Sequence, residues 1–205
     1  MKKGYTLAEV MVALALIGVI AALTIPTFVA NSYNRTYAAK LSTTITALET
    51  ALFSMISNEV VNDLSETEFS SNKNAIQKYI KISNFSTSSN NCSFTLKNGA
   101  EVDYTNSSKS ETKDGITYDS IGTFNIDVNS KSVKPDIKGR DQFLFRIGND
   151  GVLHPAGSKI FSILEKSGND THTWYGGSSS NYACNTAGND GCTARLIENN
   201  FVIDY

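Results

Sequence analysis

Residues 1–23 read MKKGYTLAEVMVALALIGVIAAL, and this stretch decides how the whole chain is organised. It begins with Lys2 and Lys3 and continues into fourteen residues, Val10 to Leu23, that have no polar side chain. An apolar helix of about 20 residues crosses a bilayer, and lysines at one end favour the cytoplasmic side for that end. Glu9 stands directly before the apolar run. Because a carboxylate enters a membrane helix against a penalty, Glu9 is a candidate functional residue.

Three common explanations of an apolar N-terminus fit these residues less well. A secretory signal peptide is cleaved after its apolar core at small residues of the Ala-x-Ala kind, whereas residues 21–26 read AALTIP. An ordinary anchor helix fits the length from Tyr5 to Ile25 but leaves Glu9 unexplained. A buried helix of a soluble protein is disfavoured, because basic residues beside an uninterrupted apolar run follow the positive-inside pattern of membrane segments.

Residues 3–14, KGYTLAEVMVAL, resemble the class III signal of type IV pilins and type II secretion pseudopilins. The resemblance implies that a prepilin peptidase cuts between Gly4 and Tyr5 on the cytoplasmic side and methylates the new N-terminus. Tyr5 stands where the family usually has phenylalanine, and it keeps the aromatic ring. Glu9 matches the assembly glutamate of the family. Gly18, Pro26 and the alanine-rich run between them match further family features.

Physical reasoning gives Glu9 a function in assembly. Cleavage after Gly4 creates an α-amino group at Tyr5, which is positively charged near neutral pH. About one helical turn, or 6 Å along the axis, separates this amine from Glu9. In a bundle of identical helices staggered by that distance, the amine of one subunit lies level with the carboxylate of its neighbour. Because unpaired charges are costly in an apolar setting, we expect loss of Glu9 to impair assembly more than folding.

The helix is predicted to continue beyond the apolar run. Pro26 lacks a backbone donor and predicts a kink. Beyond it, apolar residues recur at steps of three and four, which is typical of an amphipathic helix: Tyr37, Leu41, Ile45, Leu48, Leu52 and Met55. We therefore predict a leader peptide at 1–4, a transmembrane and filament-core helix at 5–26, an amphipathic continuation at 27–60 and a globular head at 61–205. The alternative is an anchor followed by a separate helix.

The head is predicted to be α+β. After Val60 the composition shifts to Ser, Thr, Asn, Asp and Gly, which is typical of loops and short strands. The turn Asn98-Gly99 between alternating residues predicts a hairpin. Other predicted elements are a helix at 72–82, strands at 115–118, 123–128, 142–147 and 152–154, and a second hairpin turn at 149–151. The expected fold is a long N-terminal membrane-spanning helix packed against a small antiparallel β-sheet, a pilin-like arrangement.

The three cysteines all lie in the head. Cys184 and Cys192 enclose a short loop rich in Gly and Asn, so a bridge between them is favoured over a pairing with Cys92. A disulfide near the C-terminus also resembles pilins and implies an oxidising compartment. Cys92 is then either buried and inert or linked to another chain. A zinc site is disfavoured, because the sequence has no Cys-x-x-Cys pair.

One loop of the head is a weak candidate for a cation site. Calcium binds clustered carboxylates and carbonyls, and some pseudopilins use it to brace the head. Five oxygen-bearing side chains lie within fifteen residues: Asp127, Asn129, Ser130, Asp136 and Asp141. Because their spacing does not match an EF-hand, a solvated turn is favoured, and no metal or cofactor is predicted.

Two further classes of function are disfavoured. The chain has two histidines and none of the Gly-x-Ser-x-Gly, P-loop or His-Glu-x-x-His motifs, so we predict no enzyme. A formal net charge of -2 disfavours a broadly basic nucleic-acid surface. Trp174 and Tyr175, which precede a Gly- and Ser-rich stretch, form either a contact loop for a partner or, more favoured, the edge of a core.

The resemblance implies a structural subunit of a type IV pilus-like filament, a type II secretion pseudopilus or a DNA-uptake pseudopilus. The implied partners are copies of itself and other pilin-like subunits, the prepilin peptidase, an inner-membrane assembly platform and membrane lipid. The implied location is a single pass through the bacterial inner membrane, with the head in the periplasm or outside, and a cell-surface filament after assembly. The alternatives are a filament-tip adhesin or binding module that uses Trp174, and an anchored periplasmic domain that does not polymerise.

Overall fold

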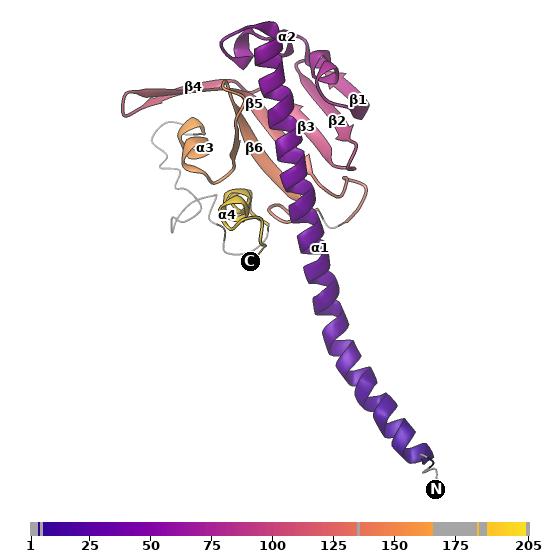
Figure 1. Cartoon of the computed structure of the whole chain (residues 1–205). Coiled ribbons are helices and arrows are strands. Elements are labelled where there is room, and N and C mark those ends of the chain that lie inside the picture. Colours follow the sequence, from indigo (N-terminus) through magenta and orange to yellow (C-terminus); the bar gives the residue numbers. More distant parts are fainter. Residues whose placement is uncertain (1–3, 5, 135, 166–183, 185–187, 204–205) are drawn as a thin grey trace.

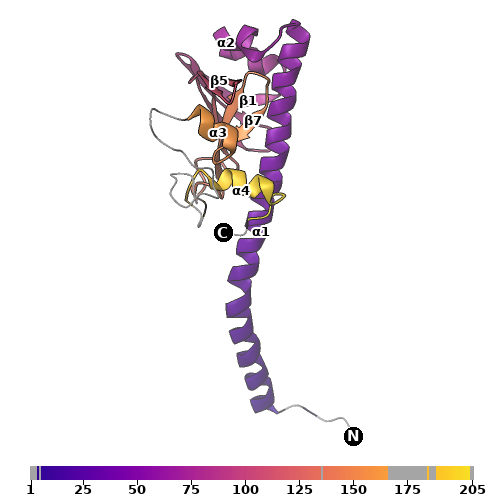
Figure 2. The ribbon, with the colours of Figure 1, turned by 90° about the vertical axis from the view of Figure 1, so that its left-hand side faces the viewer.

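One helix, α1 (Leu7–Glu59), organises the molecule and extends far beyond the head (Figure 1). The computed structural model describes residues 4, 6–134, 136–165, 184 and 188–203. The 53 residues of α1 give a helix about 80 Å long. The head lies along its C-terminal part, and the N-terminal part projects away from it in both views (Figures 1 and 2). The structure therefore has one continuous helix where the sequence left open an anchor and a separate helix.

Pro26 lies inside α1 without ending it. Hydroxyl groups next to the proline bond to the backbone of the preceding turn: Thr24 Oγ1 donates to Ile20 O at 2.9 Å, and Thr27 Oγ1 donates to Thr24 O at 2.9 Å. Neither hydroxyl bonds to Ala22 O, the carbonyl that loses its helical donor at Pro26. The helix nevertheless continues through the position at which the sequence predicts a kink.

Seven strands of the described part of the chain form one antiparallel sheet. Its order is β1-β2-β3-β5-β6-β7, and β4 pairs with the N-terminal part of β5, residues 116–120. The strands are β1 (Ile82–Ser88), β2 (Asn91–Leu96), β3 (Glu101–Thr105), β4 (Lys109–Lys113), β5 (Ile116–Asp127), β6 (Gln142–Gly148) and β7 (Leu153–Pro155). The predicted hairpin turn is present, since Gly99 N donates to Leu96 O at 2.9 Å and Gly99 has a φ of 84°. The α+β, pilin-like fold class is confirmed.

Short helices complete the head: η1 (Leu64–Glu66), α2 (Glu68–Ser71), η2 (Lys73–Lys78), α3 (Lys159–Leu164) and α4 (Cys192–Glu198), of which η1 and η2 are 3-10 helices. The predicted helix at 72–82 is wrong in extent and type, because only Lys73–Lys78 is helical and Ile82 begins β1. The two strands predicted at 115–118 and 123–128 belong to one strand of 12 residues, β5.

The core lies between the sheet and the C-terminal half of α1. The predicted apolar stripe of α1 is confirmed: Tyr37, Leu41, Leu48, Leu52 and Met55 are buried, and Ile45 packs against them. The sheet contributes a row of aromatic and aliphatic side chains to the same cluster, namely Phe94, Val102, Tyr104, Phe124, Ile126, Phe143, Phe145 and Ile147. This burial is the main force that attaches the head to α1.

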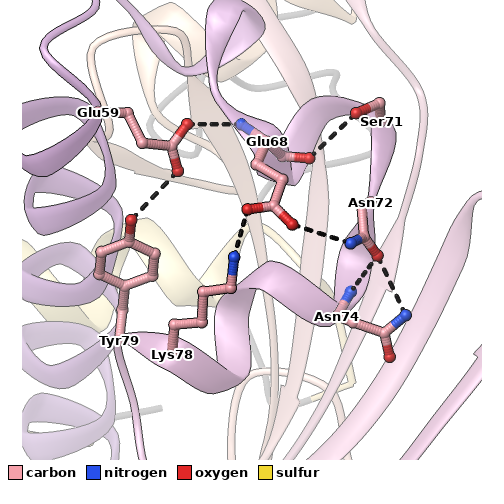
Figure 3. A network of polar contacts seen from close by, with 7 residues as sticks. All are labelled: Glu59, Glu68, Ser71, Asn72, Asn74, Lys78 and Tyr79. Carbon is pink, nitrogen blue, oxygen red and sulfur yellow. Dashed lines mark hydrogen bonds and ion pairs between the residues drawn. The ribbon is translucent and has the colours of Figure 1, made fainter.

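Polar contacts fix the C-terminal end of α1 to the segment that follows it (Figure 3). The carboxylate of Glu59 accepts a bond from Glu68 N at 2.6 Å and a second from the hydroxyl of Tyr79 at 3.2 Å. Glu68 in turn pairs with Lys78, whose Nζ donates at 2.5 Å, and accepts a bond from Asn72 Nδ2 at 3.0 Å. The bond from Lys78 lowers the pKa of Glu68. The helix end and the segment 68–79 are therefore held as one unit.

A buried arginine joins β6 to its neighbours. The Arg146 side chain is 2% exposed, and its Nη1 donates to Ser107 O at 2.8 Å and to Ser120 Oγ at 3.1 Å. Its Nη2 forms an ion pair with Glu165, at the end of α3. Lys109 Nζ donates to the other oxygen of Glu165 at 2.7 Å. Glu165 thus neutralises two cations, one of them fully buried.

A disulfide between Cys184 and Cys192, the first residue of α4, closes the loop that precedes this helix. Gly139, with a φ of 77°, lies directly against this bridge, and a Cβ there would come within 2.3 Å of the Cys192 Cβ. Arg195 Nη1 donates to Cys184 O at 2.8 Å, and Ala194 N donates to Ala156 O at 3.1 Å. The bridge that the loop composition favours is therefore the one in the structure.

Loss of the disulfide is expected to lower the free energy of unfolding by roughly 2–3 kcal/mol, the chain-entropy value for a loop this short. The measurement is urea unfolding of the full chain in detergent, comparing wild type with Cys184→Ser/Cys192→Ser. Cys92→Ala is the control, because the Cys92 thiol forms no disulfide. Reduction is expected to destabilise wild type and Cys92→Ala equally and to leave the double variant unchanged. A double variant that reduction destabilises further would contradict this assignment.

Candidate processing and assembly site

The N-terminus of α1 is closed by a reciprocal pair of hydrogen bonds between Thr6 and Glu9. Thr6 is the N-cap, and its hydroxyl oxygen accepts a bond from Glu9 N at 3.3 Å. Glu9 Oε2 accepts bonds from Thr6 N at 2.9 Å and from Thr6 Oγ1 at 3.0 Å. This is a capping box, which satisfies backbone donors that a helix N-terminus leaves unpaired.

The capping box stabilises the carboxylate of Glu9 within its own chain. Its carboxylate lies over the positive end of the helix dipole, where a negative charge is stabilised. Both bonds from Thr6 go to Oε2, and no described residue donates a hydrogen bond to Oε1. Sequence reasoning missed Thr6, although Thr6-Leu7-Ala8-Glu9 has the Ser/Thr-x-x-Glu pattern of a capping box and was readable. Glu9 is thus satisfied within its own chain and keeps one oxygen for a partner.

Two glycines near this site have no packing role in the isolated chain. A Cβ added at Gly4 or at Gly18 would meet no atom within 4 Å. Gly18 lies inside α1, where glycine costs about 1 kcal/mol relative to alanine. Contacts within the described part of the chain therefore do not require glycine at either position. Tyr5 lies outside the described residues.

The N-terminal half of α1 presents apolar side chains to its surroundings on all sides. No residue from 7 to 36 is buried. α1 is the one helix of the described residues that is long and apolar enough to cross a membrane. Its large exposed apolar side chains are Leu7, Val10, Met11, Val12, Leu14, Leu16, Ile17, Val19, Ile20, Leu23, Ile25, Phe28 and Val29. An apolar surface of this extent requires lipid or other helices as its environment.

Residues 1–25 match the family model of the prokaryotic N-terminal methylation motif. The chain carries a prepilin-type signal. This is the signal of type IV pilins and pseudopilins. It implies processing by prepilin peptidase and assembly with other pilin subunits, and proteins of this kind are typically structural rather than enzymatic. Together with the apolar half of α1, the signal fits a single-pass inner-membrane anchor. Comparison with curated proteins and with solved structures gave no match.

The oxygen-bearing side chains of the loop at 127–141 bond to the protein itself. Asp127 accepts bonds from Asn129 N at 3.1 Å and from Gln142 Nε2 at 3.3 Å, and Asp141 accepts one from Ile137 N at 2.7 Å. Asp136 pairs with Lys134. Burial raises the pKa of both Asp127 and Asp141. Within the described ranges, no three His, Cys, Asp or Glu residues gather as a metal ion requires. Asp127 and Asp141 are buried, so the expected solvated turn is wrong for these two residues. Asp136 Oδ1 and Asp141 Oδ2 are buried and have no hydrogen-bond partner among the described residues.

The remaining candidate residues differ in what the structure says of them. Cys92 is 4% exposed, and burial raises the pKa of its thiol to about 11, so it is protonated and inaccessible near neutral pH. This arrangement fits the inert role rather than a link to another chain. Trp174 and Tyr175, the candidate contact loop, lie outside the described residues.

Proposed function

We propose that this protein is a structural subunit of a type IV pilus-like filament or a type II secretion pseudopilus. The observation that carries the proposal is the prepilin-type signal at the start of a 53-residue helix whose first half is apolar and exposed and whose second half holds the head. A helix of this kind inserts into the membrane as a monomer and forms the core of a helical bundle as a polymer.

Cleavage after Gly4 prepares the chain for assembly. The new amine at Tyr5 lies next to Thr6, whose backbone nitrogen already donates to Glu9 Oε2. In a staggered bundle, the amine of one subunit reaches the neighbour's Glu9 on the oxygen that the capping box leaves unused. The pairing neutralises both charges in an apolar setting and fixes one register.

The proposal includes the partners and the route of the chain. The precursor enters the inner membrane with Lys2 and Lys3 on the cytoplasmic side and the head in the periplasm. The prepilin peptidase removes residues 1–4, and an assembly platform moves the mature subunit into a filament of this and other pilin-like subunits.

Mass spectrometry of the N-terminus tests the proposal. We expect the mature chain to begin at Tyr5 and to carry one methyl group. We expect Gly4→Val to remain uncleaved but folded and inserted, because a side chain at residue 4 meets no other atom. Gly18→Ala is the matched control and is expected to be cleaved like wild type. A wild-type chain that still begins at Met1 in cells that make the filament would overturn the proposal.

A further inference from the structure

A cationic groove lies beside α1 where the helix enters the head. It has a volume of about 440 Å³ and is lined by Arg35, Thr36, Ala39, Lys40, Thr43 and Asn98. The lining contains two cations and no acidic side chain. Asn98 belongs to the β2–β3 turn and is held against α1 by its bond to Thr44 Oγ1 at 2.9 Å. The groove is thus formed by one face of the helix and one turn of the sheet.

Arg35 and Lys40 both have N–H groups that donate to no described residue. Arg35 is exposed, and no described residue accepts a hydrogen bond from its guanidinium group. Lys40 Nζ makes one bond, to Val128 O at 3.3 Å, which leaves two of its three protons. Ala39, which also lines the groove, is exposed. Two cations beside an exposed methyl group suit an anionic headgroup with an attached hydrocarbon chain, and arginine in particular binds phosphate with two parallel bonds.

The position of the groove along α1, just beyond the apolar half of the helix, indicates that its partner is a membrane lipid. The distance from Leu7 to Val29 along the axis is about 33 Å, which matches the hydrocarbon thickness of a bilayer. Exposed Phe28, at the end of this span, and Tyr33, just beyond it, lie at the level where aromatic side chains lie in the membrane interface. Arg35 lies about 9 Å beyond Val29 and is the first charged residue after Glu9.

Side-chain direction brings the cations closer to the membrane. Cα–Cβ bonds of a helix tilt toward its N-terminus, so Arg35 and Lys40 lean toward the bilayer. Since headgroups extend about 5–8 Å from the hydrocarbon, the guanidinium group of Arg35 reaches this layer. We propose that the groove binds the phosphate of a phospholipid in the periplasmic leaflet and so sets the height of the head above the membrane. This inference rests on the membrane insertion in the proposed function.

The test uses native mass spectrometry of the full chain in detergent, titrated with phosphatidylglycerol. Arg35→Gln/Lys40→Gln is expected to retain the lipid about tenfold less well than wild type, and Arg35→Gln alone about threefold less well. Lys113→Gln is the control, because this lysine lies at the end of β4 and outside the groove lining. Diacylglycerol, which has the same chains without phosphate, and glycerol phosphate, which has the phosphate without chains, are both expected to bind at least tenfold more weakly than phosphatidylglycerol.

Three results would overturn the inference. The first is that the double variant and wild type retain phosphatidylglycerol equally, and the second is that diacylglycerol binds as well as phosphatidylglycerol. The third is that the double variant loses a self-association that wild type shows without lipid. That result would assign the groove to an acidic group of a second copy. Carbonate extraction of membranes, done in parallel, separates this inference from the proposed function. A wild-type chain that fails to insert contradicts both, whereas a chain that inserts and is cleaved but binds lipid without these cations contradicts only the groove.

Discussion

Replacement of Glu9 with alanine is expected to abolish filament assembly while the chain is still made, inserted and cleaved. Without the carboxylate, the amine of the neighbouring subunit remains unpaired in an apolar setting, which costs about 3–5 kcal/mol. This corresponds to association that is weaker by roughly a hundredfold or more. The measurement compares the amount of sheared filaments with the total amount of processed subunit, whose N-terminus is checked by mass spectrometry.

Two matched variants separate the pairing from the capping box. Glu9→Gln retains an oxygen that accepts the bond from Thr6 N, since glutamine also serves in capping boxes, but it removes the charge. Thr6→Ala removes the cap, at a cost of about 1 kcal/mol, and keeps the charge. We expect Glu9→Gln to fail in assembly like Glu9→Ala and Thr6→Ala to assemble. If Thr6→Ala failed and Glu9→Gln assembled, the function of Glu9 would be helix capping alone.

Glu165→Ala is expected to lower the free energy of unfolding of the head by about 3 kcal/mol. The substitution removes the carboxylate that pairs with the buried guanidinium group of Arg146, and breaking such an ion pair from one side is strongly destabilising. Urea unfolding of the full chain in detergent, followed by near-ultraviolet circular dichroism, measures the change.

Lys109→Gln is the matched control for Glu165→Ala, because Lys109 contacts the same carboxylate but is 36% exposed. We expect it to lower stability by less than about 1 kcal/mol, as exposed ion pairs contribute little. We also expect Glu165→Met/Arg146→Met to be less destabilising than Glu165→Ala, because it removes the buried charge of Arg146 together with its partner. Equal losses in Glu165→Ala and Lys109→Gln would show that Arg146 does not depend on Glu165.

The long helix and the central hairpin were predictable from the sequence because their signals are local. The apolar run and the stripe from Tyr37 to Met55 have a period that only a helix satisfies. Asn98-Gly99 specifies its turn without tertiary help. By contrast, β1 reads ISNFSTS and is mostly exposed, and β4 reads KSETK, so neither carries an alternating apolar pattern. These two strands form because their backbones hydrogen-bond to a neighbouring strand. The sequence of each segment alone does not predict this pairing.

The wrong prediction at 72–82 has a tertiary cause. The apolar residues of this segment fit a helical period, but Lys73 Nζ donates to Phe69 O and Ser70 O, both at 2.7 Å, and is buried over the rings of Phe69 and Tyr104. Tyr79 is held by Glu59, at the end of α1. These contacts favour a short 3-10 helix, which is followed by β1 from Ile82. None of them is visible in the periodicity of the segment.

The candidate sites also differ in how far they could be predicted from the sequence. Gly4, Tyr5 and Glu9 lie in one short signal, and Thr6 belongs to a pattern within it that can also be read directly. The groove beside α1 was not predictable, because Lys40 and Asn98 are far apart in sequence and meet only after the sheet has packed on the helix.

The burial pattern of α1 makes the molecule modular. The matched signal ends at residue 25, and the first side chain that the head buries is Tyr37. Between them the helix has no buried residue, so no side chain has to satisfy the packing of the head and the requirements of the signal at once. Packing changes in the head therefore leave the residues of the signal unaffected. In the proposed filament, the head could vary while the signal and the apolar part of α1 stay the same.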